Sequence, residues 1–163
     1  MNSIIDAEYR LSVLQANVED ASISLWRDDV AVLSESQMAQ RTEHIVAATS
    51  NLLTGLCRAR RDGVGVEAFN ASHATLNVAT ARISNAVPDD NSKRLKKALR
   101  AVEVCRDVAS ILAGGCGYPD DVETLMTALR KNHPAVHKAV SDAVHDPWPY
   151  GDAISIDAET KAA

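Results

Sequence analysis

The chain has 163 residues, of which 46% are hydrophobic and 24% are charged, so its composition suits one globular domain and excludes wholesale disorder. Its net charge is -5 at pH 7, which argues against a protein that binds nucleic acid over its whole surface. Aromatic residues make up only 4%, which favours closely packed helices with an aliphatic core over a β-sandwich. Cys57, Cys105 and Cys116 are an odd number without a CxxC pair, so they indicate neither a disulfide framework nor a zinc knuckle.

The first helix is predicted over about residues 3 to 27. Its apolar residues are spaced alternately by three and four positions, which is typical of helical bundles and coiled coils. These positions are Ile4, Ala7, Leu11, Leu14, Val18, Ala21 and Leu25. Four more apolar residues widen the stripe, namely Ile5, Tyr9, Ile23 and Trp26. We therefore expect this helix to contact more than one neighbour.

The second helix is predicted to begin within "LSESQM" and to end at "RARRDGVG". Ser34 and Gln37 have the spacing of a capping box, in which each side chain bonds the backbone N–H of the other residue. Gly63 supplies the left-handed residue that commonly ends a helix. Between these signals apolar residues repeat every seven positions, at Met38, Ile45, Leu52 and Ala59. The pattern predicts a long helix with one buried side.

Two further long helices are predicted over about residues 66 to 87 and 93 to 113. The stripe of the first is Phe69, His73, Leu76, Thr80, Ile83 and Val87. The stripe of the second is Leu95, Ala98, Val102, Cys105, Ala109 and Leu112. "GGCGYPDD" ends the second of them, and two shorter helices are expected over about residues 120 to 132 and 134 to 146. The prolines of "DPWPYGD" then stop helix formation.

These elements predict an all-α fold, an antiparallel helical bundle of about four long helices with a C-terminal helical hairpin and a short extended tail. We expect one domain over residues 1–163, with a four-helix core (1–113), the hairpin (114–146) and the tail (147–163). The start "MNSIIDAEYR" is unlike a signal peptide, and no apolar run approaches the ~18 residues of a spanning helix. We therefore expect no membrane contact and a cytoplasmic location, or a place within a virion or assembly if a phage encodes the chain.

Three of the five histidines lie in "HPAVHKAVSDAVH", residues 133–145. His133 and His137 have the i,i+4 spacing with which one helix binds a metal, but Pro134 pushes His133 out of the α region. We expect His133 at or before the start of a surface helix. His137 and His145 are two turns apart, about 12 Å along the axis, which is too far for one ion. We therefore expect neither a metal nor a cofactor.

His73 lies in an apolar stripe, within "SHATLNV". Its place on a bundle helix resembles that of the histidine in four-helix histidine phosphotransfer domains, which implies a signalling role for His73 or for His44. The sequence departs from that family, because the lysine and glycine that follow its histidine are missing here. The alternative is a buried His73 that bonds a carbonyl or a hydroxyl such as that of Thr80.

Basic residues crowd the first turns of the helix predicted over 93–113. They are Lys93, Arg94, Lys96 and Lys97, with Arg100 one turn later. Cations are unfavourable at the positive end of a helix dipole, so these residues are candidates to hold an anion together with the free backbone N–H groups there. The alternative is a solvated face that the acids of "VPDDNS" partly neutralise.

The glycines around Cys116 are explained by a helix stop followed by a turn, so they do not indicate a reactive cysteine. The sequence therefore indicates no set of catalytic side chains. We therefore predict a non-catalytic helical binding, adaptor or structural-assembly protein that acts through protein–protein contacts, with a protein partner or as a homo-oligomer, and not an enzyme. Trp26, Trp148 and Tyr150 are the predicted partner contacts, since aromatic anchors dominate many interfaces. Two alternatives stay open, a histidine phosphotransfer bundle and an anion or nucleic-acid contact through the basic turn.

Overall fold

The computed structural model describes residues 3–87, 93–114 and 119–145. These residues form seven helices and no strand, so the predicted all-α class is confirmed for this part of the chain. The helices are α1 (Ser3–Ile23), α2 (Arg27–Val30), α3 (Glu35–Asp62), α4 (Val66–Ala86), α5 (Lys93–Leu112), α6 (Pro119–Asn132) and α7 (His137–His145). None of the helices in these ranges is both long enough and apolar enough to cross a membrane.

Local signals place both ends of α3 where the sequence predicts them. The Ser34 side chain accepts a hydrogen bond from the backbone N–H of Gln37, and the Gln37 side chain accepts one from the backbone N–H of Ser34. At the other end Gly63 adopts the left-handed conformation with φ of 80°. The capping box and the glycine stop are therefore confirmed.

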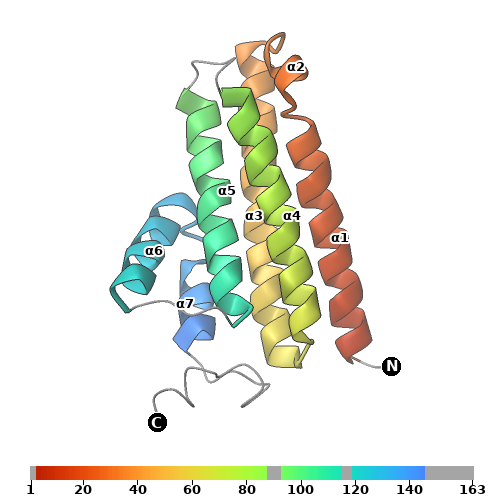
Figure 1. Ribbon diagram of the computed structural model, residues 1–163, viewed down its shortest axis with the longest axis vertical. Coiled ribbons are helices and arrows are strands. Elements are labelled where there is room, and N and C mark those ends of the chain that lie inside the picture. Colours follow the sequence, from red (N-terminus) through yellow and green to blue (C-terminus); the bar gives the residue numbers. More distant parts are fainter. Residues whose placement is uncertain (1–2, 88–92, 115–118, 146–163) are drawn as a thin grey trace.

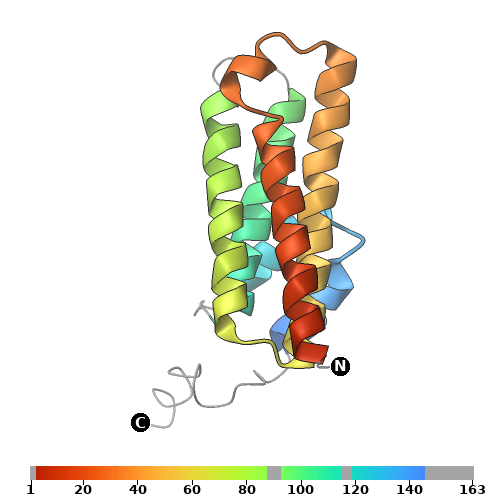
Figure 2. The same cartoon turned by 90° about the vertical axis from the view of Figure 1, so that its right-hand side faces the viewer.

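The four long helices lie side by side around a shared aliphatic core (Figures 1 and 2). α1 packs against α3 and α4, and α5 packs against the same two helices from the other side. The largest completely buried side chains include Phe69, Leu52, Leu76, Ile83 and Leu112. α6 and α7 lie beside the core, where they contact α5 and α3 (Figure 1).

The predicted end of the first helix is wrong by about one turn. α1 ends at Ile23, the chain is extended at Trp26, and the four-residue α2 follows. The amides of Leu25 and Trp26 bond the carbonyls of Ser22 and Ile23, three residues back, so the last turn tightens and the helix stops. Leu25 is still buried, which explains why the heptad pattern continues past the end of the helix.

The burial expected along α1 is only partly correct. Ala7, Leu11, Val18, Ala21 and Leu25 are buried. Ile4 is exposed and Leu14 is half-buried, and the four residues that widen the stripe (Ile5, Tyr9, Ile23 and Trp26) are exposed as well. α1 does contact two neighbouring helices, but with its buried side alone. Its second apolar stripe faces away from the rest of the described chain.

The chain after α6 also differs from the prediction. The last helix begins at His137, not at residue 134, because residues 134–136 form a turn that the Val136 N–H closes on the carbonyl of His133. His133 was expected at or before the start of a surface helix, yet it is only 2% exposed. Its backbone N–H bonds the carbonyl of Leu129, which continues the pattern of α6 and directs the imidazole toward α3 and α5.

Candidate functional site

An apolar row runs along the exposed side of α1. Ile5, Tyr9 and Val13 are spaced by four residues, and Ile23 lies on the same side of the helix ten residues after Val13. Tyr9 is 70% exposed and Ile5 is 61% exposed. We call these four residues the outer face of α1. They lie on the side of the helix opposite Leu11 and Val18, so α1 is apolar on two opposite sides.

Polar contacts to α4 fix the rotation of α1, so the outer face stays turned to solvent. The Gln15 amide donates to the hydroxyl of Ser72 over 2.8 Å, and the Arg82 guanidinium donates to the hydroxyl of Ser22 over 3.0 Å. Arg82 also pairs with Glu19 at 3.7 Å. A rotation of α1 that buried the outer face would break these contacts and expose its leucines.

The predicted partner contacts are described for Trp26 only. Trp26 is 47% exposed and follows the last turn of α1, close in sequence to Ile23. Its exposure agrees with a contact role but does not test it. Trp148 and Tyr150 lie outside the described residues.

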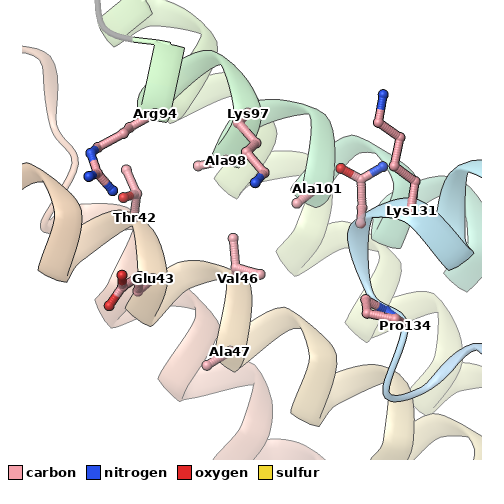
Figure 3. A pocket seen from close by; sticks show the side chains of 11 residues that line it. Thr42, Glu43, Val46, Ala47, Arg94, Lys97, Ala98, Ala101, Lys131 and Pro134 are labelled. Atoms are coloured by element: carbon pink, nitrogen blue, oxygen red, sulfur yellow. The ribbon is translucent and has the colours of Figure 1, made fainter.

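A pocket of about 490 Å³ opens between α3, α5 and residues 131–134. Its lining is Thr42, Glu43, Val46, Ala47, Arg94, Lys97, Ala98, Ala101, Lys131, Asn132 and Pro134. Figure 3 shows the Lys97 ammonium over the gap between α5 and α3, with Val46 below it and Arg94 opposite Thr42 and Glu43. We call this hollow the cationic pocket. It joins three cationic side chains to a lining of small apolar side chains.

The cationic pocket divides the predicted basic cluster. Arg94 and Lys97 line it, whereas Lys93 and Lys96 are exposed without lining it. Lys131 is the cation that sequence reasoning missed. Its place in the last turn of α6 is unremarkable locally, and only the packing of α6 on α5 brings it to the same hollow.

His133 forms a buried polar junction between three parts of the chain. Its Nδ1 lies 2.6 Å from the Ser50 hydroxyl on α3, and its Nε2 lies 3.0 Å from the Ala101 carbonyl oxygen and 3.2 Å from Cys105 Sγ on α5. These partners fit a neutral imidazole whose Nε2–H donates to Ala101 while Nδ1 accepts from Ser50. Burial lowers the pKa of His133 from its ordinary value of 6.5, and the bond to Ala101 opposes this effect.

The Ser50, His133 and Cys105 contacts resemble a nucleophile beside a base, but the surroundings favour a structural role. Burial raises the pKa of Cys105 to about 12, so its thiol is neutral at neutral pH. Ser50 and His133 do not line the cationic pocket, and His133 is almost completely enclosed. No local pattern connects Ser50 with His133, because they are 83 residues apart in the chain.

The two histidines of the phosphotransfer hypothesis lie in different settings. His44 is exposed on α3 and lines a shallow hollow with Asp20, Asp29 and Arg41. His73 is half-buried on α4. The hydrogen bond expected between His73 and Thr80 is absent from the described structure, because the Thr80 hydroxyl donates to the carbonyl of Leu76 instead.

The described residues show no cluster of metal-binding side chains. Within the described ranges, no three side chains of His, Cys, Asp or Glu gather closely enough to hold a metal ion. Among the described residues, the outer face of α1 is an exposed apolar surface and the cationic pocket is a hollow with excess positive charge, whereas the His133 junction is enclosed. Comparison with protein-family models, curated proteins and solved structures finds no match to the chain.

Proposed function

We propose that the chain is a non-catalytic binding protein in which one helical domain displays the outer face of α1 to a helix of a partner protein. In this proposal α1, α3, α4 and α5 form an antiparallel four-helix bundle, and the direction of the chain through the four helices in Figure 1 supports that arrangement. The observation that carries the proposal is the row of exposed apolar side chains at Ile5, Tyr9, Val13 and Ile23.

The geometry of the row suits a helix. Eighteen residues separate Ile5 from Ile23, which corresponds to about 27 Å of helix axis at 1.5 Å per residue. Single exposed apolar residues are ordinary, but an aligned row is typical of interaction surfaces. Amphipathic helices bind such rows through side chains at i, i+3, i+4 and i+7.

Charge favours a basic partner over a second copy of the same face. Glu8 and Asp20 are exposed on α1 within this stretch, so a partner helix with lysine or arginine beside its apolar stripe is complementary. An antiparallel pair of α1 helices centred on this row would instead bring Glu8 of one copy near Asp20 of the other. Like charges in that position oppose self-pairing.

The proposal is tested with a synthetic amphipathic helix that carries a leucine stripe flanked by lysines. Fluorescence anisotropy should detect its binding to the full chain, and a peptide with glutamates in place of the lysines should bind more weakly. Tyr9→Ser should weaken the binding about tenfold, which is about 1.4 kcal/mol. Val78→Ser is the matched control, because Val78 is an exposed apolar residue on a different helix, α4. Equal losses in both variants, or no preference between the peptides, would contradict the proposal.

Two further experiments test whether something other than a partner helix occupies the outer face of α1. The first is light scattering over a wide concentration range. A dimer that Tyr9→Ser dissociates would identify a second copy and reject the heterologous partner. The second uses a truncation that ends at Asp146, which removes Trp148 and Tyr150. If the truncated chain binds the peptide much more tightly than the full chain, the tail is the natural occupant and the proposed partner is wrong.

A further inference from the structure

The cationic pocket is unusual for a chain with a net charge of -5. Arg94 and Lys97 come from α5, Lys131 comes from α6, and Glu43 from α3 is the one acidic residue of the lining. The three cations and one carboxylate leave an excess of two positive charges in a hollow of about 490 Å³. This volume lies within the usual range of small-molecule sites.

Two of the cations lack partners in the described structure. Neither Lys97 nor Lys131 forms an ion pair or a hydrogen bond with another described residue. Both are exposed, and their flexible stems allow the ammonium groups to move toward an anion. The Lys97 ammonium already lies over the gap, whereas that of Lys131 is turned outward (Figure 3). The pocket thus holds positive charge that the described part of the chain does not neutralise there.

Five of the other eight lining residues are apolar, and one wall of the pocket is held in place by hydrogen bonds. Val46, Ala98 and Ala101 contribute small side chains between the charged groups. Asn132 and Pro134 form one wall, and the buried His133 between them anchors that wall to α3 through Ser50 and to α5 through Ala101. The hollow therefore offers cationic groups beside a firm apolar surface.

We propose that the cationic pocket binds a small organic phosphate monoester, with the phosphate on Lys97 and Lys131 and the apolar body against Ala98 and Ala101. A phosphate monoester carries a charge of about -1.5 to -2 at pH 7, which matches the excess positive charge better than a single carboxylate does. The concave shape favours a small ligand over nucleic acid, because an extended backbone would also contact the exposed Lys93 and Lys96 outside the pocket.

The test is an NMR titration of the full chain with monobutyl phosphate and with inorganic phosphate. Monobutyl phosphate should bind saturably and more tightly than inorganic phosphate, because only its butyl group contacts the apolar lining. Lys97→Gln and Lys131→Gln should each weaken binding by about fivefold to tenfold. Lys96→Gln and Arg130→Gln are matched controls, since each removes an exposed cation one position away that does not line the pocket. Both controls should stay within about twofold of the wild type.

Each outcome decides for or against the site. No saturable binding of monobutyl phosphate, or equal losses in the pocket variants and their controls, would overturn the proposal. Tighter binding of a single-stranded oligonucleotide that Lys96→Gln weakens as much as Lys97→Gln would replace it with a nucleic-acid surface. Co-sedimentation with phosphatidylcholine vesicles only when they contain phosphatidic acid, lost in Lys97→Gln and Lys131→Gln, would support the phosphate site and identify a lipid as its source.

Discussion

His133 contributes to stability through partners on two other helices. Replacing it with alanine removes the bonds to the Ser50 hydroxyl and the Ala101 carbonyl and opens a cavity. We expect His133→Ala to lower the free energy of unfolding by about 2–4 kcal/mol. Urea denaturation measures the loss, and His44→Ala, at an exposed histidine, serves as the control. Similar values for the two variants would mean that the junction contributes little.

The same residue makes stability depend on pH. Because burial lowers the pKa of His133 below 6.5, the unfolded chain binds a proton near pH 6 more readily than the native chain does. The contribution of His133 is therefore fully present above about pH 6.5 and is lost as the pH falls toward the lower pKa of the folded state. Other groups also titrate in this range, so the useful quantity is the difference between the wild type and His133→Gln. That difference should shrink between about pH 8 and about pH 5 in urea denaturation. A difference that is constant with pH would contradict the lowered pKa.

At the scale of single elements, Gly63 and Gly65 allow the effect of a left-handed backbone to be measured against a control. A Cβ added at either position meets no atom within 4 Å, so steric crowding does not distinguish them. Gly63 has φ of 80°, whereas Gly65 has φ of -65°. We expect Gly63→Ala to destabilise the chain by about 1–2 kcal/mol, because an L-residue is strained in the left-handed region. Gly65→Ala should change the thermal midpoint much less, and comparable shifts would show that α3 does not need its left-handed end.

Leu11 and Leu14 test how α1 is seated on α3. Leu11 is almost completely buried, while Leu14 is half-buried and its side chain lies where a Cβ on Gly55 would be. Leu11→Ala should cost about 2–5 kcal/mol in urea denaturation, and Leu14→Ala clearly less. The opposite order would mean that α1 is rotated from the position described here, and the outer face of α1 would then need a different set of residues.

The elements could largely be predicted from the sequence because their signals are local. Ser34, Gln37 and Gly63 define both ends of α3 within a few residues, and the three-and-four spacing of Leu11 and Val18 reports the buried side of α1. The end of α1 could not be predicted this way, because Leu25 continues the apolar pattern beyond the last helical turn. Periodicity also does not distinguish a stripe that packs from one that stays exposed, which is why Tyr9 was expected to have a neighbour.

At the scale of the whole molecule, α3 and α5 are the two helices that the other described helices enclose most. α3 packs against α1, α5 and α7, and it contributes Leu52, Leu53 and Leu56 to the core. Exposing the backbone of α3 or α5 requires several neighbours to separate, so we expect the slowest amide hydrogen exchange in the middle of these two helices and the fastest in the four-residue α2. Hydrogen-exchange mass spectrometry measures these rates. Faster exchange in α3 than in α4 would contradict this order.

The candidate sites depend on how the helices pack together, and this packing could not be predicted from the sequence. The basic turn of α5 was found because Arg94 and Lys97 are neighbours in the chain. Lys131 and His133 join the same region only through the packing of α6 and α7 on α3 and α5. Such contacts depend on topology, because the partners of His133 are 32 and 83 residues away.

Cys57 and Cys105 are buried, so the rate at which each thiol reacts with a reagent reports how often the surrounding helices separate. Burial raises the pKa of Cys57 to about 11 and that of Cys105 to about 12, so an alkylating reagent should modify them only while the surrounding helices separate. Cys105, on α5, lies beside His133. Cys57 is on α3, two turns after the Ser50 that bonds His133. In a chain with Cys116 replaced by serine, a ligand in the cationic pocket should therefore slow the alkylation of Cys105 more than that of Cys57. The ratio of the two rates would separate local tightening of one wall from a general stabilisation of the protein.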